Sequence, residues 1–322
     1  MTTAADQTDL VVERVNDAVH RIELPLPLDD LHIVNAYAIL GSTGIALVDP
    51  GWSSPESEEI LLRALGSLGA GLGDVRRTLV THAHPDHFTQ ASAWQRDHGI
   101  PLHLGVGEAP SVVGFEPTLN RFPRQADLLE SAGAPELART IRHLPLEPHE
   151  VAMSWELPEV WVVDQQVLDC DGEAVLVHAT PGHTRGHVVY EHVASGAYFT
   201  GDHVLPGITP AISLELVPEN LPLASYLASL ELLLGLHDGP MLPAHGPVTA
   251  SVHARAHALI AHHDARFAMI TGLRDSGLTT AFEIAGAMPW RSNGRALSEL
   301  NEVHQMIAVI EVLAHLDVLD RA

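Results

Sequence analysis

The sequence predicts an α/β protein in which two β-sheets lie between layers of helices. Short apolar runs alternate with amphipathic helical segments up to about residue 105, and further strand-like runs begin at about residue 160. After residue 250 the apolar residues recur at helical spacing. We therefore expect a large sandwich domain over residues 1–250 and a small helical subdomain over residues 251–322.

The N-terminal part contains the expected strands and helices in alternation. Residues 11–26 and 33–40 are predicted strands, and a Gly-Ser-Thr-Gly hairpin turn follows the second. Residues 55–68 are a predicted helix, because Ser54 is suited to cap it and Pro55 to start it. A strand at 75–80, a helix at 88–98 and a strand at 101–104 continue the alternation.

The segment from Thr81 to His87 (Thr-His-Ala-His-Pro-Asp-His) places three imidazoles and one carboxylate within six positions, directly after a predicted strand. These side chains are the types that bind zinc, iron or manganese. Because Pro85 excludes a helix through the motif, we expect the ligands on a loop leaving the strand end. A chance polar loop in a histidine-rich chain is the alternative, which the dense spacing disfavours.

Four further strand-like runs end in turns that carry His or Asp. They present Asp49 in Asp-Pro-Gly, His183 in Pro-Gly-His-Thr, Asp202 in Gly-Asp and His245 in Ala-His-Gly. Because residues of types that bind metals occur at several strand ends, we expect them to form one shared site. His187 and His203 stand beside these motifs, and we expect both to support the site structurally.

In their order and composition, these motifs resemble those of the metallo-β-lactamase fold hydrolase superfamily over roughly residues 10–250. The nearest resemblance is to its glyoxalase II-like and lactonase-like members. It implies an αββα sandwich with a dinuclear metal site. It says little about the substrate, because one scaffold can host many reactions.

The resemblance also implies a role for each motif residue. His82, His84 and His183 match the ligands of a first metal, Asp86, His87 and His245 match those of a second, and Asp202 matches the carboxylate that bridges both. Asp49 matches a residue that orients the ligand segment. Two divalent ions are therefore expected, with Zn²⁺ favoured and iron or manganese as alternatives.

The implied chemistry is attack by a hydroxide shared between two metal ions, because a bound divalent cation lowers the pKa of a coordinated water to about 7. Asp86 is the expected catalytic residue, since it would orient that hydroxide. The chain contains no lysine. Schiff-base chemistry and a phosphate-binding lysine are therefore excluded.

The motifs are compatible with three functions. The first is a hydrolase of small acyl substrates, namely thioesters, lactones or esters, which the complete ligand set favours. The second is a metal-dependent phosphodiesterase or ribonuclease. The third is a non-hydrolytic di-iron or binding protein, although a fused flavin domain is not accommodated in 322 residues. The absence of lysine disfavours a glutathione thioester within the first class.

The composition limits the binding partners and the cellular location that we expect for this protein. A net charge of −24 disfavours nucleic acid as a partner, and residues 251–322 contribute only −2 of it, from six Arg against eight acidic residues. The N-terminal residues do not resemble a secretory signal, and no apolar run reaches the length of a membrane span. Cys170 is the single cysteine and cannot form an internal disulfide. We expect a cytoplasmic enzyme that acts on a small molecule.

Residues 106–158 are irregular, and in the resembled family an insertion here often covers the metal cleft. Its aromatic residues are expected to line the substrate pocket, or alternatively to form the insertion's own small core. The apolar loop 201–216 is expected to form a pocket wall, or alternatively a homodimer contact. Arg121 and Arg124 are interpreted as solvated surface, with binding of an acidic group as the alternative. The pocket candidates are Phe115, Phe122, Met153, Trp155, Arg185, Leu205 and Ile208.

The C-terminal residues are predicted to form three helices, at 265–275, after Thr280 and at 299–319. Thr280 and Glu283 form a capping-box pattern that opens the second helix. The order resembles the winged-helix-like tail of one clade of the superfamily, without room for a wing. We expect a packing or dimerisation element, and we interpret the histidines of residues 253–263 as a solvated helix face.

Overall fold

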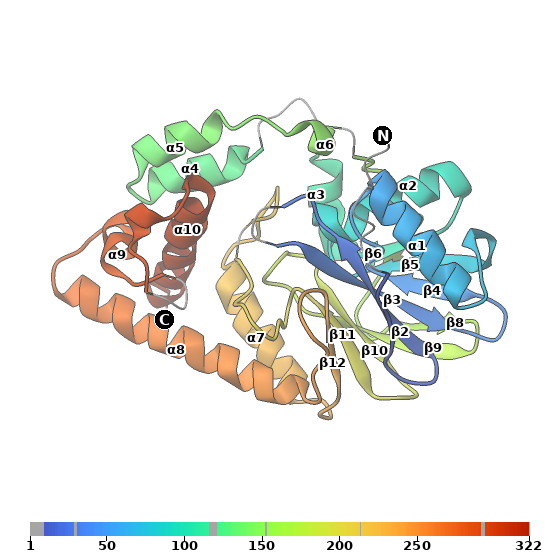
Figure 1. The fold of residues 1–322 in the computed structure, drawn as a ribbon. Helices are drawn as coiled ribbons and strands as arrows, with labels where there is room; N and C mark the ends of the chain where they lie inside the picture. Colours follow the sequence, from blue (N-terminus) through green and yellow to red (C-terminus); the bar gives the residue numbers. More distant parts are fainter. Residues whose placement is uncertain are drawn as a thin grey trace.

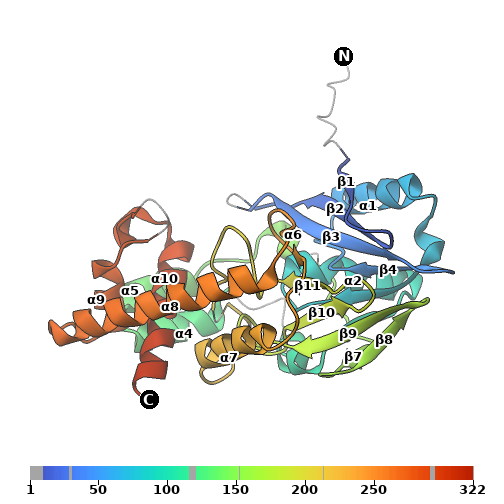
Figure 2. The same cartoon turned by 90° about the horizontal axis from the view of Figure 1, so that it is seen from below.

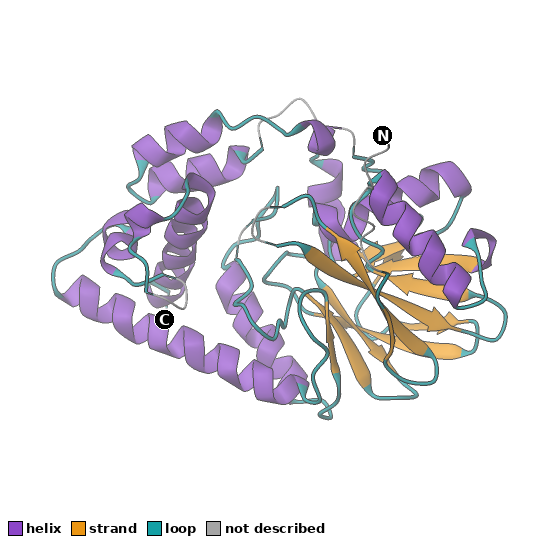
Figure 3. Cartoon of the chain, in the orientation of Figure 1, coloured by secondary structure: helices purple, strands orange, loops and turns teal. Residues whose placement is uncertain are grey.

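The computed structural model describes residues 10–28, 31–115, 121–151, 153–212, 214–290 and 294–321. Two β-sheets pack face to face, and helices cover their outer faces (Figure 1, Figure 3). A helical unit that contains the C-terminus lies beside this sandwich. The predicted α/β sandwich with a C-terminal helical subdomain is therefore confirmed.

The first sheet contains strands in chain order. These are β1 (Val12–Arg14), β2 (Val19–Pro25), β3 (Ile33–Leu40), β4 (Ile45–Val48), β5 (Val75–Val80), β6 (Leu102–Gly105) and β7 (Val160–Val162). Strands β1 to β4 are antiparallel and β4 to β7 are parallel. Parallel neighbours require crossovers, which α1 (Pro55–Ser67) and α2 (Pro85–His98) supply. The carboxyl ends of β4 and β5 therefore reach the same sheet edge.

The predicted strand at residues 11–26 is interrupted between β1 and β2. The side-chain oxygen of Asn16 accepts hydrogen bonds from the backbone N–H groups of Ala18 (2.9 Å) and Val19 (2.8 Å). Asn readily closes turns through such bonds. The extended run therefore folds back on itself as a hairpin.

The second sheet has the order β12-β11-β10-β9-β8. Its strands are β8 (Val167–Cys170), β9 (Glu173–Ala179), β10 (Val188–His192), β11 (Ala197–Gly201) and β12 (Met241–Pro243). Strands β8 to β11 are antiparallel, and β11 and β12 are parallel across the connecting helix α7 (Pro222–Leu234). Tyr37, Leu79 and Val177 are among the buried residues that fill the space between the sheets.

Helix α2 begins at Pro85, three residues earlier than expected, and the expectation that proline excludes a helix here is wrong. Proline is well suited to the first helical position, where its missing N–H has no acceptor to lose and its fixed φ matches the helix. His84 precedes the helix, whereas Asp86 and His87 lie in its first turn.

The C-terminal helices are α8 (Val252–Asp275), α9 (Ala281–Ala287) and α10 (Glu302–Leu319). Thr280 and Glu283 form the predicted capping box at the start of α9. Helix α8 begins earlier than expected, capped by Ser251. His263 on this helix is fully buried, and its Nδ1 lies 3.1 Å from Nε2 of His315. The interpretation of a solvated histidine face is therefore wrong for His263.

The segment 106–158 reaches away from the sandwich to the C-terminal helices. It contains α3 (Ala109–Val113), α4 (Pro123–Ser131), α5 (Pro135–Arg142) and α6 (Pro148–Val151). Figure 2 shows α4 and α5 against α8 to α10. These helices share one hydrophobic core that includes Leu129, Ile141, Ile270, Ile284 and Met306. The domain boundary at residue 250 stays a prediction, and this core joins residues from both sides of it.

Among the described residues, no helix combines the length and apolarity that crossing a bilayer requires.

Candidate metal centre

Seven side chains converge at the edge of the sandwich where strands of both sheets end. The residues follow β5 (His82 and His84), open α2 (Asp86 and His87), and follow β9 (His183), β11 (Asp202) and β12 (His245). They form two groups, one of His82, His84, His183 and Asp202, the other of Asp86, His87 and His245. Within each group the potential ligand atoms lie within 4.8 Å of one another. The structure thus brings together all seven ligand candidates.

Asp202 lies between the two groups. Its Oδ2 is 3.7 Å from Nε2 of His183, whereas its Oδ1 is 3.4 Å from Nε2 of His245 and 3.7 Å from Nε2 of His87. The two carboxylate oxygens therefore face different groups, as the carboxylate of a shared ligand would.

Backbone carbonyl groups fix the tautomers of two histidines. Nδ1 of His183 donates to the carbonyl oxygen of Ala211 at 2.7 Å, and Nδ1 of His245 donates to that of Ile33 at 2.8 Å. In its neutral form, each ring then presents Nε2 as an unprotonated nitrogen. Nε2 of His183 lies 3.1 Å from Nδ1 of His84, so imidazole nitrogens of two chain segments meet at one point.

Asp49 fixes two more rings. Its Oδ1 accepts from the backbone N–H of Thr81 at 2.8 Å, and its Oδ2 accepts from the Thr81 hydroxyl at 2.8 Å and from Nδ1 of His87 at 3.0 Å. Because the Thr81 hydroxyl donates to Asp49, it accepts from Nδ1 of His82 at 3.0 Å. These bonds hold Asp49 at φ +47°, which is uncommon outside glycine. This geometry gives Asp49 the means to orient the ligand segment.

The resulting arrangement suits divalent cations. Buried polar atoms nearly always have hydrogen-bond partners. Nε2 of His82, His87 and His245 and Oδ1 of Asp202 are nevertheless buried without one among the described residues. Imidazole nitrogens and carboxylate oxygens that converge in this way are ligands for zinc, iron or manganese.

The pKa values differ between the two ligand groups. Burial lowers the pKa of His84 to about 3 and that of His183 to about 4, so both rings are neutral at pH 7. Burial opposes a charge on His87 too, yet the carboxylates of Asp86, Asp49 and Asp202 raise its pKa to about 10. The second group therefore attracts positive charge strongly, which a divalent cation would supply.

Two glycines let the ligand loops approach closely. A Cβ on Gly201, which has φ +49°, would lie 2.5 Å from Oγ1 of Thr81. A Cβ on Gly182, which has φ +137°, would lie 2.4 Å from Cα of Tyr226. Glycine thus precedes both Asp202 and His183 because a larger residue would displace the ligand that follows it.

Two further histidines support the site without belonging to either ligand group. The ring of His187 stacks on that of His82 with centroids 5.0 Å apart, and Oγ1 of Thr180 lies 2.9 Å from its Nδ1. His203 is buried behind His187, with ring centroids 5.7 Å apart.

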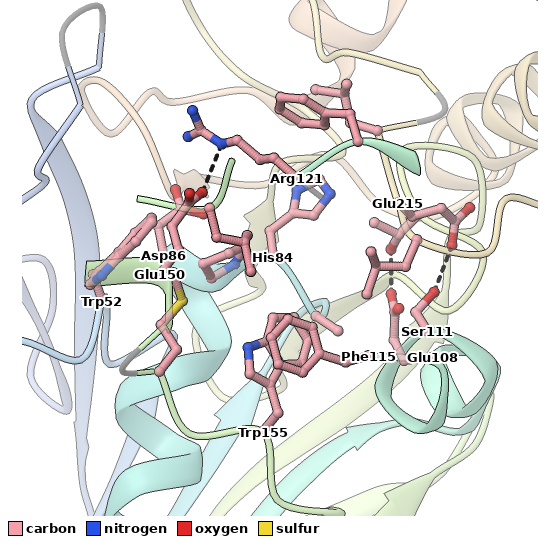
Figure 4. Close-up of a pocket in the computed structure, with 18 of the residues that line it drawn as sticks. Trp52, His84, Asp86, Glu108, Ser111, Phe115, Arg121, Glu150, Trp155 and Glu215 are labelled. Atoms are coloured by element: carbon pink, nitrogen blue, oxygen red, sulfur yellow. Dashed lines mark hydrogen bonds and ion pairs between the residues drawn. The ribbon is translucent and has the colours of Figure 1, made fainter. Parts of the chain in front are cut away.

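A cavity of about 260 Å³ opens beside His84 and Asp86 (Figure 4). Leucines at positions 28, 146, 214 and 216 and the ring of Trp52 give it a mainly apolar wall. Four of the pocket candidates line it, namely Phe115, Phe122, Met153 and Trp155.

The other three pocket candidates lie outside this lining. The side chain of Arg185 donates to the carbonyl oxygen of Val217 at 3.4 Å. Leu205 is buried, and its carbonyl oxygen accepts from Arg255. Ile208 is 50% exposed.

Charged residues that were not among the pocket candidates also line the cavity. Arg121 forms an ion pair of 2.8 Å with Glu150, so its interpretation as solvated surface is wrong. Burial raises the pKa of Glu108 to about 7, and burial together with the charge of Glu108 raises that of Glu215 to about 8. The sequence carries no signal for Glu108 and Glu215, because each lies in a segment without clear helical or strand periodicity.

Comparisons with known proteins agree with this geometry. A family model described as the metallo-beta-lactamase superfamily matches residues 29–245. The chain is 23% identical to the probable metallo-hydrolase YqjP of Bacillus subtilis over 306 residues, which cover 93% of this chain and 91% of that protein.

A crystal structure and a named thioesterase are also similar. The metallo-beta-lactamase family protein TTHA1429 of Thermus thermophilus has a TM-score of 0.74 and 27% identity, covering 96% of this chain and 95% of that one. The atrochrysone carboxyl ACP thioesterase of Aspergillus terreus is 31% identical over 126 residues, 39% of this chain and 36% of that protein.

Proposed function

Because the chain belongs to the metallo-β-lactamase superfamily and its seven ligand candidates form two groups, we propose that it is a dinuclear metal-dependent hydrolase of small acyl esters or thioesters. The position of Asp202 between the two groups is the observation that carries this proposal. A site that shares one carboxylate holds two cations at close range.

The cations and the side chains have separate tasks. When bound, two divalent cations lower the pKa of a coordinated water to about 7 and polarise the carbonyl group under attack. His82, His84 and His183 would hold one cation, Asp86, His87 and His245 the other, and Asp202 both. Zn²⁺ is the proposed metal, since these ligands suit it.

Asp86 is the proposed catalytic residue. Its Oδ2 lies 3.3 Å from Nε2 of His245 and 3.5 Å from Nε2 of His87, and the residue also lines the cavity. It can therefore hold the second group in place while accepting a hydrogen bond from the attacking water. No Ser, Cys or Lys nucleophile is needed for this chemistry.

Three observations support an acyl substrate. The cavity wall is mainly apolar, as the acyl portion of an ester or thioester requires. A net charge of −24 disfavours polyanionic phosphodiesters. One similar protein is named as a thioesterase. The cytoplasmic location and the homodimer stay predictions.

Hydrolysis by the purified, metal-analysed protein would test the proposal. The panel would contain acyl thioesters, lactones, simple esters and bis-p-nitrophenyl phosphate. The Asp86→Asn variant would serve as the blank, and Asp97→Asn, an identical change at an exposed position, as the control. Acyl turnover that Asp86→Asn loses and Asp97→Asn retains supports the proposal. Turnover of the phosphodiester alone contradicts it.

A further inference from the structure

We infer that the cavity beside the metal centre selects acyl groups that bear an anionic substituent, which Arg121 binds in an orientation set by Glu150. This inference rests on the proposed acyl hydrolysis and names the substrate class within it. Arg121 would be a specificity-determining residue and Glu150 its positioning residue.

Arg121 places a positive charge at the cavity of a protein whose net charge is strongly negative. Among the described residues that line the cavity, it is the only Arg or Lys. The whole chain has 17 basic residues against 41 acidic ones. An arginine in this wall, beside the candidate metal ligands His84 and Asp86, is therefore well placed to attract an anionic part of a substrate.

The guanidinium of Arg121 is held in one orientation. Its Nε lies 2.8 Å from Oε1 of Glu150, a carboxylate that is only 7% exposed. Oε2 of Glu150 accepts from the backbone N–H of Glu147 at 2.7 Å, which fixes the carboxylate in turn. The guanidinium carbon also lies 5.3 Å from the ring centroid of Phe122. An arginine tethered through Nε loses little further freedom when it binds a ligand.

The ion pair with Glu150 leaves part of the Arg121 guanidinium available to bind a ligand. The ion pair with Glu150 is made through Nε, so the two terminal amino groups are the part of the guanidinium left for a ligand. These groups form the fork that binds a carboxylate through two parallel hydrogen bonds. The Arg121 side chain is 26% exposed, so a ligand in the cavity can reach it.

The cavity wall opposite Arg121 suits the apolar part of a substrate. The rings of Phe115 and Trp155 stack 4.3 Å apart at 15°, and Trp155 packs on Phe88 at 5.0 Å. Figure 4 shows Arg121 and this aromatic pair on opposite sides of the cavity, with His84 between them. Nε1 of Trp155 is buried without an acceptor among the described residues. A second oxygen of the substrate would satisfy this donor.

Kinetics with a matched substrate pair tests the inference. Glutaryl and valeryl thioesters of N-acetylcysteamine have acyl chains of equal length and differ in one terminal carboxylate. The wild-type protein should hydrolyse the glutaryl compound with a kcat/KM about 10- to 100-fold higher, the factor typical of hydrogen bonds to a charged group. Arg121→Gln should bring this ratio close to one.

Two further variants separate recognition from a structural role. Arg124→Gln removes an equal charge from a neighbouring exposed position and should keep the wild-type ratio. Glu150→Gln should lower the ratio through a higher KM for the glutaryl compound, with less effect on kcat. A purely structural ion pair would instead change both substrates equally. A wild-type ratio near one, or an unchanged ratio in Arg121→Gln, overturns the inference.

Binding measurements keep the inference testable if neither thioester is hydrolysed, a result that counts against the proposed function. Thioether analogues, with a methylene in place of the thioester carbonyl, would be titrated calorimetrically into the metal-loaded protein. Tighter binding of the carboxylate-bearing analogue, lost in Arg121→Gln, supports the inference. Equal binding of both analogues overturns it.

Discussion

Replacement of Asp49 by Asn tests the hydrogen-bond network that orients the candidate metal ligands. Three donors converge on this carboxylate, namely the backbone N–H and hydroxyl of Thr81 and Nδ1 of His87. An Asn side chain has one acceptor oxygen, and its NH₂ group would face at least one of the three donors. If the NH₂ group takes the Oδ2 position, the hydroxyl of Thr81 is no longer fixed as the acceptor for His82.

The expected effect follows from the bonds that are lost. A hydrogen bond to a charged group contributes about 1.5–3 kcal/mol, and each 1.4 kcal/mol corresponds to about tenfold in an equilibrium constant. Loss of one such bond should therefore weaken metal binding by about 10- to 100-fold, as found when groups that orient metal ligands are removed. The second cation should be affected more where the NH₂ group takes the Oδ2 position, because His87 then loses its direct partner.

Competition with a chromophoric chelator at neutral pH would measure both metal affinities. Asp97→Asn is the matched control, since Asp97 is exposed and lies away from the ligand groups. Circular dichroism would verify that Asp49→Asn is folded. Affinities within twofold of wild type in the folded variant would refute the proposed role of Asp49.

Two further predictions concern stability and backbone geometry. Burial lowers the pKa of His263 to about 3 and that of His315 to about 4, against an ordinary value of 6.5. The two buried neutral rings therefore contribute fully to the unfolding free energy above pH 6.5. This contribution is lost as the pH falls below 6.5, because the unfolded chain binds protons that the folded protein does not. His263→Leu should flatten the decline in unfolding free energy below pH 6.5 by up to about 1.4 kcal/mol per pH unit, measured by urea denaturation, and an unchanged slope contradicts this. Gly201→Ala should reduce metal content and thermal stability, because its Cβ would overlap neighbouring side chains, whereas Gly207→Ala, which has open space, should change neither. Equal metal content in both alanine variants would show that this reasoning is wrong.

Local sequence determined the strand ends and the ligand candidates. His82, His84 and His87 are fixed close together by covalent spacing after one strand, whatever the rest of the chain does. Asp202 and His183 each follow a glycine whose positive φ the structure requires. Such turn chemistry acts within a few residues, so it can be read from the sequence without knowledge of packing.

Local rules failed where one residue suits two environments. Pro85 excludes a helix interior but is favoured at a helix start, and only the chain that follows decides between them. His263 resembles other polar residues on a helical stretch, yet contact with His315, far along the chain, buries it. The sequence pattern cannot distinguish a buried histidine pair from a solvated face.

Tertiary structure alone decided the arrangement around the cavity. Helices α4 and α5 share a core with α8 to α10, although more than a hundred residues separate them in the sequence. The return of the segment 106–158 from this core brings Arg121 and Glu150 together at the cavity. The sequence by itself determined which residues can hold metal ions, because ligand chemistry and turn spacing are local. The substrate-facing wall was decided by long-range packing, because burial of apolar surface is indifferent to the order of the residues that bury it.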